Sequence, residues 1–244
     1  MIKDILTDIV AHTHSLGFLP LVKITGAKDS TAIESMAEDR SVIVTANAHK
    51  PVAEFEGTFG MPNLDKLNLH LRNPEYKENA QINVTKANRN GADVPTGLHF
   101  ENQAGDFQND YRFMNAEIIN EKLKTVKFKG AAWDVEFEPS MAAIGRLKLQ
   151  AAAHNEETVF QVRTEDNNLV FFFGDASTHA GSFVFQPEIG SKLKHTWAWP
   201  VGQVQSILNL DGKITMKIAD AGAMQITVDS GVAEYNYILP AQSK

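Results

Sequence analysis

The feature that most constrains the fold is an order of secondary structure that occurs twice along the 244-residue chain. Apolar spacing and capping residues predict four helices, which begin near residues 2, 63, 139 and 200. The first and third starts are 137 residues apart, and so are the second and fourth. Each half is thus predicted to contain a helix, a run of strands, a second helix and more strands. We expect an α+β protein with two domains, 1–120 and 121–244, and a connector at about 115–124.

Apolar residues on one side predict each helix. In the segment 2–16, Ile5, Leu6 and Ile9 follow helical spacing, and Gly17 stands where a C-terminal cap belongs. The other helices are expected at 63–72, 139–154 and 200–210, the third with its apolar side formed by Met141, Ile144, Leu147 and Ala151. Residues 86–95 are expected to form a polar loop. Strands are predicted at 19–25, 31–38, 41–47, 52–59, 80–85, 97–101, 111–114, 125–129, 133–138, 158–163, 169–173, 181–186, 195–199, 213–219, 223–229 and 233–239.

Known catalytic and cofactor motifs are missing from the sequence. There is no cysteine, which excludes disulfides, thiolate nucleophiles and cysteine-ligated metals. The patterns G-x-G-x-x-G, G-x-x-x-x-G-K-[ST], G-x-S-x-G and H-E-x-x-H do not occur. His12 and His14 are close in sequence, but residues two apart on a helix point to different sides, so we expect solvated side chains rather than a metal site. The chain is therefore predicted to have no catalytic residues, no metal and no cofactor.

The N-terminus and the apolar segments predict a protein that does not enter a membrane. The first eight residues contain two acids and no apolar core, unlike a signal peptide. The longest apolar run, 169–173, is far shorter than the ~20 residues that span a bilayer. With no cysteine, the composition suits a reducing compartment. We expect a cytoplasmic location, which would be the host cytoplasm for a viral protein.

Net charge argues against a conventional nucleic-acid-binding domain but leaves room for a small basic face. The net charge is −7, and neither half of the chain has a run of basic residues. Basic residues do gather on two predicted helices: Lys66, His70 and Arg72 with Lys77 just beyond, and Arg146 with Lys148. On an amphipathic helix these side chains project away from the sheet, where they suit loose contact with a phosphate backbone. Ordinary solvated helix charges are the alternative interpretation.

The order of elements resembles a DNA sliding clamp of the two-domain type that closes into a homotrimer, as in the proliferating cell nuclear antigen and bacteriophage clamps. The most specific part is the end of the chain: WAWP at 197–200, the fourth helix, the strands 213–219 and 223–229, and EYNYILPA at 234–241. DYRFM at 110–114, followed by the connector, resembles the end of a clamp's first domain. The resemblance covers essentially the whole chain in the order of its elements.

The resemblance implies a ring of six domains, with β-sheets outside and helices around duplex DNA inside. It implies a processivity factor that tethers the replicative DNA polymerase without chemistry of its own. Its partners would be duplex DNA of any sequence, the C-terminal peptide of the polymerase and a clamp loader. The DNA-facing residues would be Lys66, His70, Arg72, Lys77, Arg146 and Lys148. The chain departs from the pattern because 201–210 has no Lys or Arg and the first helix has only Lys3; Lys192, Lys194 and Lys213 could add charge from loops.

The resemblance also implies two protein-binding sites. A pocket for partner peptides would be formed by Ile118, Ile119, Leu123, Met224, Tyr237, Leu239 and Pro240. Alternatively, Tyr237 and Leu239 are core residues of the last strand. Subunits would join through edge strands at 107–114 and 181–186, with Tyr111, Phe113, Phe183 and Phe185 as contacts.

Two other classes of protein remain as alternatives. One is a β-rich viral structural or tail protein whose helices only pack against sheets. The other, a β-sandwich enzyme, ranks lower because no catalytic constellation occurs. The mass in solution separates the first alternative from a clamp, because three 26.9 kDa subunits give about 81 kDa.

Overall fold

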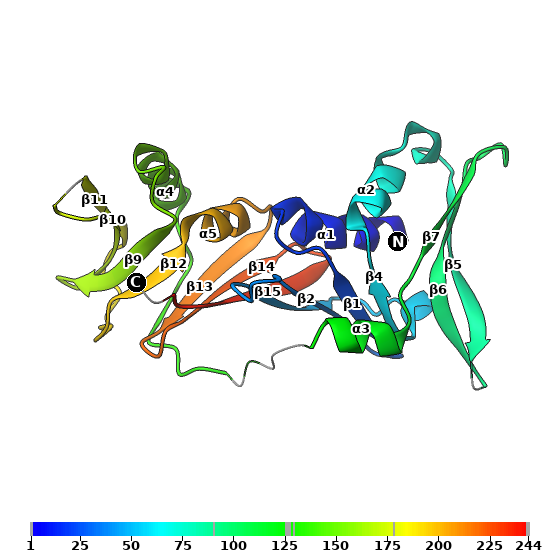
Figure 1. Ribbon diagram of the computed structural model, residues 1–244, viewed down its shortest axis with the longest axis horizontal. Coiled ribbons are helices and arrows are strands. Elements are labelled where there is room, and N and C mark those ends of the chain that lie inside the picture. Colours follow the sequence, from blue (N-terminus) through cyan, green and yellow to red (C-terminus); the bar gives the residue numbers. More distant parts are fainter. Residues whose placement is uncertain (1, 90, 125–127, 129, 178, 243–244) are drawn as a thin grey trace. The chain divides into compact units, whose positions relative to one another are not determined.

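The computed structural model describes residues 2–89, 91–124, 128, 130–177 and 179–242 (Figure 1). The chain divides into two compact units. The first comprises Met1–Val126 with Asp229–Tyr235, and the second comprises Lys127–Val228 with Asn236–Lys244. The sequence placed the boundary at 120/121 and assigned everything after it to the second domain. In the structure the change of unit falls at 126/127, and the short segment 229–235 belongs with the first unit.

The first unit has two sheets. Four antiparallel strands follow the order β4-β1-β2-β3, namely β4 (Gly57–Met61), β1 (Val22–Gly26), β2 (Thr31–Met36) and β3 (Ile43–Ala48). Three further strands form an antiparallel sheet of β5 (Gln81–Arg89), β6 (Ala92–Glu101) and β7 (Gln108–Arg112). Its helices are α1 (Ile2–His12), α2 (Leu64–Arg72) and α3 (Ala116–Lys122), with 3-10 turns at His14–Leu16, Ala53–Phe55 and Pro74–Tyr76.

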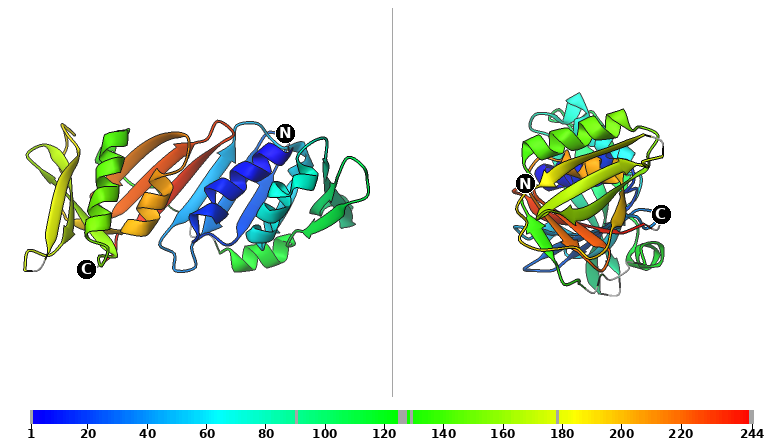
Figure 2. Two further views of the ribbon diagram at one scale, coloured as in Figure 1. Left: turned by 90° about the horizontal axis from the view of Figure 1, so that it is seen from above. Right: turned by 90° about the vertical axis from the view of Figure 1, so that its left-hand side faces the viewer.

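Alternating burial explains how α1 and α2 are held on this sheet. On β2, Thr31, Ile33 and Ser35 are buried and the residues between them are half-buried, as expected for a strand with one core-facing side. The apolar stripe of α1 is fully covered, including Leu6 and Ile9. The helices α1 and α2 pack side by side over one face of the sheet (Figures 1 and 2). The alternate positions, which include Lys23 of β1 and Glu34 of β2, lie on the opposite side.

The second unit repeats the plan of one main sheet, a second sheet and two helices. The main sheet follows β15-β14-β13-β8, with β8 (Val135–Phe137), β13 (Lys213–Ala219), β14 (Ala223–Asp229) and β15 (Ala233–Pro240), the last shared with the first unit. The other sheet is antiparallel and follows β11-β10-β9-β12, with β9 (Val159–Glu165), β10 (Asn168–Gly174), β11 (Ala180–Gln186) and β12 (Trp197–Pro200). The helices are α4 (Met141–Ala153) and α5 (Val201–Leu208), which pack against each other.

The four predicted helices are all present as α1, α2, α4 and α5, and the predicted bounds of β13 and β14 match to the residue. Two predictions are wrong. The segment 52–59 contains a 3-10 turn before β4 begins, and the expected loop 86–95 is a hairpin in which β5 and β6 continue to the turn at Gly91. The connector, for which the sequence predicted no secondary structure, contains the helix α3. The predicted strand 125–129 lies almost wholly outside the described residues.

The connector helix α3 is capped at its N-terminus and packs on β4. The Asn115 side chain accepts a hydrogen bond from the backbone N–H of Ile118 at 2.9 Å, which caps the helix. Ile119 is buried against Gly60 of β4, and Leu123 is buried as well. Within the described residues, no helix is both long and apolar enough to cross a membrane.

Candidate nucleic-acid interface

The α2 helix separates a buried apolar side from an exposed basic side. Leu64, Leu67 and Leu71 are buried at helical spacing. This orientation leaves Lys66 and Arg72 exposed, together with Lys77 in the following turn. Lys66 and Arg72 therefore occupy the solvent side of the helix, as the sequence predicted, and Lys77 is exposed beyond its end.

His70 differs from the other residues predicted to face DNA. Its ring packs against Phe100 with 5.2 Å between ring centroids, and its Nε2 atom is buried without a hydrogen-bond partner among the described residues. Burial, and then the positive charge of Lys66, lower the pKa of His70 below its ordinary value of 6.5. His70 was predicted to face DNA, but its ring lies against Phe100 and its lowered pKa favours the neutral form, so it adds no positive charge to α2.

The α4 helix presents the same kind of basic side. Its first turn is capped by Ser140, whose Oγ accepts from the backbone N–H of Ala143 at 3.1 Å. Ala143, Ile144 and Leu147 face the core, so that Arg146 and Lys148 project into solvent. Met141 is exposed and was wrongly assigned to the apolar side, because the buried stripe begins two residues later.

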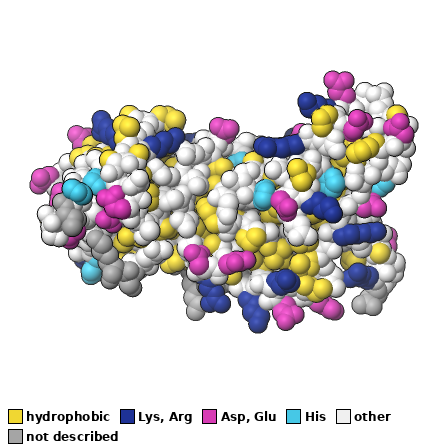
Figure 3. All heavy atoms as spheres, turned by 45° about the horizontal axis from the view of Figure 1, so that its top comes forward, with side chains coloured by type: hydrophobic (Ala, Val, Ile, Leu, Met, Phe, Trp, Pro, Cys, Tyr) yellow, Lys and Arg dark blue, Asp and Glu magenta, His cyan; other side chains and the backbone are white. Residues whose placement is uncertain are grey.

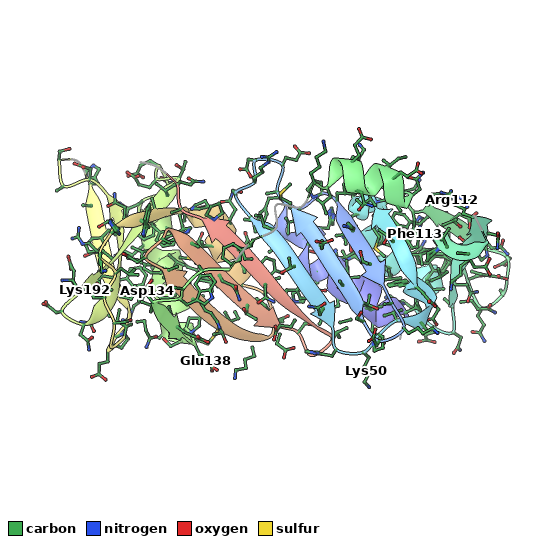
Figure 4. The ribbon with its side chains drawn as sticks, turned by 90° about the horizontal axis from the view of Figure 1, so that it is seen from below. Lys50, Arg112, Phe113, Asp134, Glu138 and Lys192 are labelled. Carbon is green, nitrogen blue, oxygen red and sulfur yellow. The ribbon has the colours of Figure 1, made fainter. Side chains whose placement is uncertain are left out.

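Cations on the helices are unpaired, whereas those on the two main sheets are paired. In the part of the chain that the structure describes, no carboxylate lies in ion-pair distance of Lys66, Arg72, Lys77, Arg146 or Lys148. Every lysine of the two main sheets has such a partner: Lys23 with Glu34 at 2.9 Å, Lys217 with Glu136 at 3.0 Å, and Lys213 with Glu138 at 2.8 Å. Glu138 is labelled in Figure 4. The helices α2 and α4 therefore offer unpaired positive charge to a ligand, and the lysines of the two main sheets do not.

The remaining helices supply little charge. Lys3 of α1 donates a hydrogen bond to the backbone oxygen of Tyr76 at 2.6 Å, so its ammonium group is already bound within the protein. The α5 helix contains no Lys or Arg. Of the predicted loop contributors, Lys192 and Lys194 are exposed, and Lys213 is engaged by Glu138.

Exposed hydrophobic residues on the same helices were missed by the sequence interpretation. Leu69 on α2 and Met141 and Leu149 on α4 stand in solvent. Hydrophobic side chains lie beside Lys and Arg on the helix-bearing face, clearly so over α4 (Figure 3). Helical spacing could have identified Leu69 and Leu149 as exposed, because each falls outside the apolar stripe of its helix.

The predicted subunit joint falls on edge strands, but half of its side chains are core residues. Within their sheets, β7 and β11 each have one neighbouring strand. Tyr111 is buried and donates to the backbone oxygen of Pro62, and Phe185 is buried and stacks on Phe171 at 4.2 Å. These two residues were wrongly expected at the surface. Phe113 and Phe183 are half-buried, and Val184 is exposed on β11.

The same correction applies to the predicted peptide pocket. Met224, Tyr237 and Leu239 are fully buried, because alternate residues of β14 and β15 face the core. Tyr237 and Leu239 thus follow the alternative interpretation as core residues. The connector residues Ile119 and Leu123 are buried too, which leaves only Ile118 and Pro240 exposed.

Both N-terminal histidines were predicted to be solvated, and for His12 this prediction is wrong. His12 is buried and stacks on Tyr235, with 4.4 Å between ring centroids, and its Nδ1 lies 2.9 Å from the backbone oxygen of Asp8. Tyr235 in turn donates to the Asp8 carboxylate at 2.8 Å. His14 is half-buried. Among the described residues, no group of three or more His, Asp or Glu side chains is arranged to hold a metal ion.

Comparison with known proteins gives a clear result for structure and none for sequence. No protein-family model matches the sequence. No curated protein matches it either. Proliferating cell nuclear antigen (PCNA) from Thermococcus kodakaraensis matches with a TM-score of 0.68 at 13% identity, over 98% of this chain and 97% of that chain.

Two further solved structures give the same result. PCNA from A. fulgidus, bound to the C-terminal region of FEN-1, matches with a TM-score of 0.67 at 13% identity, over 99% of this chain and 95% of that chain. PCNA from Entamoeba histolytica matches with a TM-score of 0.61 at 11% identity, over the same shares. The chain therefore has the fold of the PCNA sliding clamps over nearly its whole length.

Proposed function

We propose that this chain is the subunit of a homotrimeric ring that encircles duplex DNA and tethers a replicative DNA polymerase to its template. The observation that carries the proposal is the division of positive charge. Unpaired cations stand on α2 and α4, whereas the lysines of both main sheets are neutralised by carboxylates. In a clamp ring the helices line the hole, so the unpaired cations of α2 and α4 would meet the duplex.

Duplex DNA makes physical sense as the ligand of these helices. It carries about one negative charge per 1.7 Å of axis, and Lys and Arg contacts to phosphate hold it without selecting a sequence. A ring is retained by its topology, so a few weak and mobile contacts suffice. A net charge of −7 would keep DNA from binding elsewhere on the protein.

The proposed ring closes through β7 of one subunit and β11 of the next. Each of these strands has an unoccupied edge within its own sheet, and backbone groups on such an edge can pair with another strand. The half-buried rings of Phe113 and Phe183, with exposed Val184, would add apolar contact. The ring would have no catalytic residue.

The proposed protein partners are a clamp loader and the C-terminal peptide of the polymerase. The A. fulgidus PCNA supports a peptide partner, because that clamp binds the C-terminal region of FEN-1. In this chain, the exposed residues available to such a peptide are Ile118 on the connector helix and Pro240 at the end of β15.

The sharpest test asks whether DNA passes through the protein. A ring can thread onto a linear duplex with free ends, and it cannot thread when both ends are blocked by bulky proteins beforehand. We expect retention on the open duplex after a salt challenge and none on the blocked one. Replacing Lys66, Arg72, Arg146 and Lys148 by alanine should weaken association with the open duplex and flatten its salt dependence, because phosphate contacts are lost.

Two results would count against the proposal. Equal retention on open and blocked duplexes would indicate binding to an outer surface. No association at low salt would favour a structural protein whose helices only pack against sheets. Thermal unfolding provides the control for the fourfold variant, because exposed charges usually change stability by less than ~0.5 kcal/mol each.

A further inference from the structure

The most exposed large hydrophobic side chains in the described part of the chain all lie on α2 and α4. Leu69 is 69% exposed, Met141 80% and Leu149 73%. No other large hydrophobic side chain among the described residues is more than 43% exposed. Single exposed apolar residues are ordinary, but here they share their helix faces with the unpaired cations.

Each leucine lies within one helical turn of a basic residue. Leu69 is three residues from both Lys66 and Arg72, and Leu149 is three residues from Arg146. Residues three apart on a helix are neighbours, with about 5–6 Å between their Cβ atoms. The two helices therefore present the same combination, a leucine flanked by long cationic side chains.

This combination is not a by-product of the internal repeat. In the repeated order, α4 corresponds to α1 and α5 corresponds to α2. Among the described residues, α1 and α5 expose no large hydrophobic side chain and no unpaired Lys or Arg. Apolar and basic groups thus occur together on two helices that the repeat does not relate.

We infer that Leu69, Met141 and Leu149 contact the deoxyribose groups of duplex DNA while the neighbouring Lys and Arg contact phosphates. The inference rests on the proposed function and deepens it. Charge complementarity selects this occupant: the leucines are flanked by Lys66 and Arg72 and by Arg146 and Lys148, none of which has a carboxylate partner in the described structure. These cations outnumber the one exposed carboxylate on the two helices, Asp65, so the surface fits a polyanion. Along a DNA strand each phosphate alternates with a sugar that presents C–H groups, which matches a cation beside a leucine.

The two kinds of contact respond differently to salt. Phosphate contacts weaken as salt rises, because counterions compete for the phosphates. Apolar contacts depend on the area removed from water, so salt does not screen them. A ring with both kinds keeps part of its hold on DNA when its charges are screened, and apolar contacts with sugars neither read bases nor fix a position.

The test uses the full chain with Leu69→Gln, Met141→Gln and Leu149→Gln together. Glutamine is uncharged like the residues it replaces, so the net charge of the protein does not change, and it is a good helix former. Dissociation constants for an open linear duplex are measured by fluorescence anisotropy from about 50 to 200 mM salt. We expect association about fivefold weaker at every salt concentration, with the slope against log salt unchanged; this is about 1 kcal/mol, the effect of removing roughly 40 Å² of apolar contact.

Matched variants separate this effect from others. Met36→Gln removes a methionine from the strand side that carries Glu34, and it should leave association unchanged. Lys66→Gln with Arg146→Gln should instead flatten the salt slope. Circular dichroism and thermal unfolding verify that the triple variant stays folded.

The outcomes distinguish this inference from the proposed function. Equal affinity of the wild type and the triple variant would overturn the inference while leaving the clamp proposal intact. A changed slope in the triple variant would also overturn it, because the effect would then act through charge. Sedimentation of the wild type beyond a trimer, abolished in the triple variant, would assign the leucines to contact between protein copies. If the wild type itself fails to bind open duplex, the proposed function fails.

Discussion

At the scale of single residues, His70 shows why a basic residue on a basic helix need not carry charge. Four residues separate it from Lys66, so both lie on neighbouring positions of α2. Yet the imidazole ring turns toward Phe100, while the longer lysine side chain extends into solvent. Burial and the like charge of Lys66 both disfavour the protonated ring.

This environment predicts a loss of stability in mild acid. The pKa of His70 is lower in the folded protein than its ordinary value of 6.5, so the unfolded chain binds more protons as pH falls below that value. The free energy of unfolding should therefore decrease from about pH 6.5 down to the folded-state pKa. His70→Gln should remove this part of the decrease. Urea unfolding of both proteins at several pH values measures it, and identical pH profiles would refute the assignment.

Sequence patterns identified the exposed cations but not which side chains are covered. Lys66, Arg72, Arg146 and Lys148 follow from helical spacing, because a long charged side chain opposite an apolar stripe reaches solvent. The alternation of residues along the last strand does not decide whether Tyr237 and Leu239 are core or surface residues. Their burial depends on what packs over their side of β15, and a local pattern does not contain that information.

At the scale of elements, the connector helix depends on one glycine. A Cβ atom on Gly60 would lie 2.8 Å from Cδ1, 2.9 Å from Cγ1 and 3.0 Å from Cβ of Ile119. The last of these atoms is next to the backbone, so rotation of the side chain cannot relieve the contact. The absence of a side chain at Gly60 therefore permits α3 to pack on β4.

Gly60→Ala should destabilise the protein by about 1–3 kcal/mol, the usual cost of overpacking a core. The connector should become more sensitive to protease. Gly145→Ala is the matched control, because nothing lies within 4 Å of its added Cβ and alanine favours the α4 helix. That variant should gain about 0.5–1 kcal/mol. Urea unfolding measures both changes, and a neutral Gly60→Ala would show that α3 is not held by this contact.

The elements themselves were largely predictable from the sequence, and the errors have physical causes. Strong apolar periodicity located the four covering helices and most strands. The segment 86–95 is polar because its hairpin is exposed, so polarity was mistaken for a loop. The alternation in 52–59 suggested one strand, but Val52 and Phe55 are brought to the core by a 3-10 turn.

At the scale of the whole molecule, the proposed ring predicts a definite mass. The wild type should sediment at about 81 kDa, three times 26.9 kDa. Val184→Asp should give folded monomers, because it places a charge in the joint from an exposed position. Phe185→Asp should instead unfold the second unit, since Phe185 is buried against Phe171.

Thr25→Asp, on an exposed position of β1, is the control and should remain trimeric. A trimer that survives Val184→Asp would place the joint on another edge.

The twofold repeat predicted the number of domains expected in such a subunit. It did not reveal that residues 229–235 belong with the first unit, because strand pairing between distant parts of a chain leaves no local signal.

The segment 229–235 sets the order in which the protein can fold during synthesis. Tyr235 completes the packing of His12 and Asp8, and 227 residues separate it from Asp8. At ~5–20 residues per second, the ribosome needs roughly 10–45 s to make the chain between them. Throughout that interval the first unit lacks its last strand segment and exposes the side of α1 that Tyr235 later covers. Residues 127–228 of the second unit are made before the first unit is complete, and residues 236–244 follow directly after Tyr235, so both units wait for the last strand before either is complete.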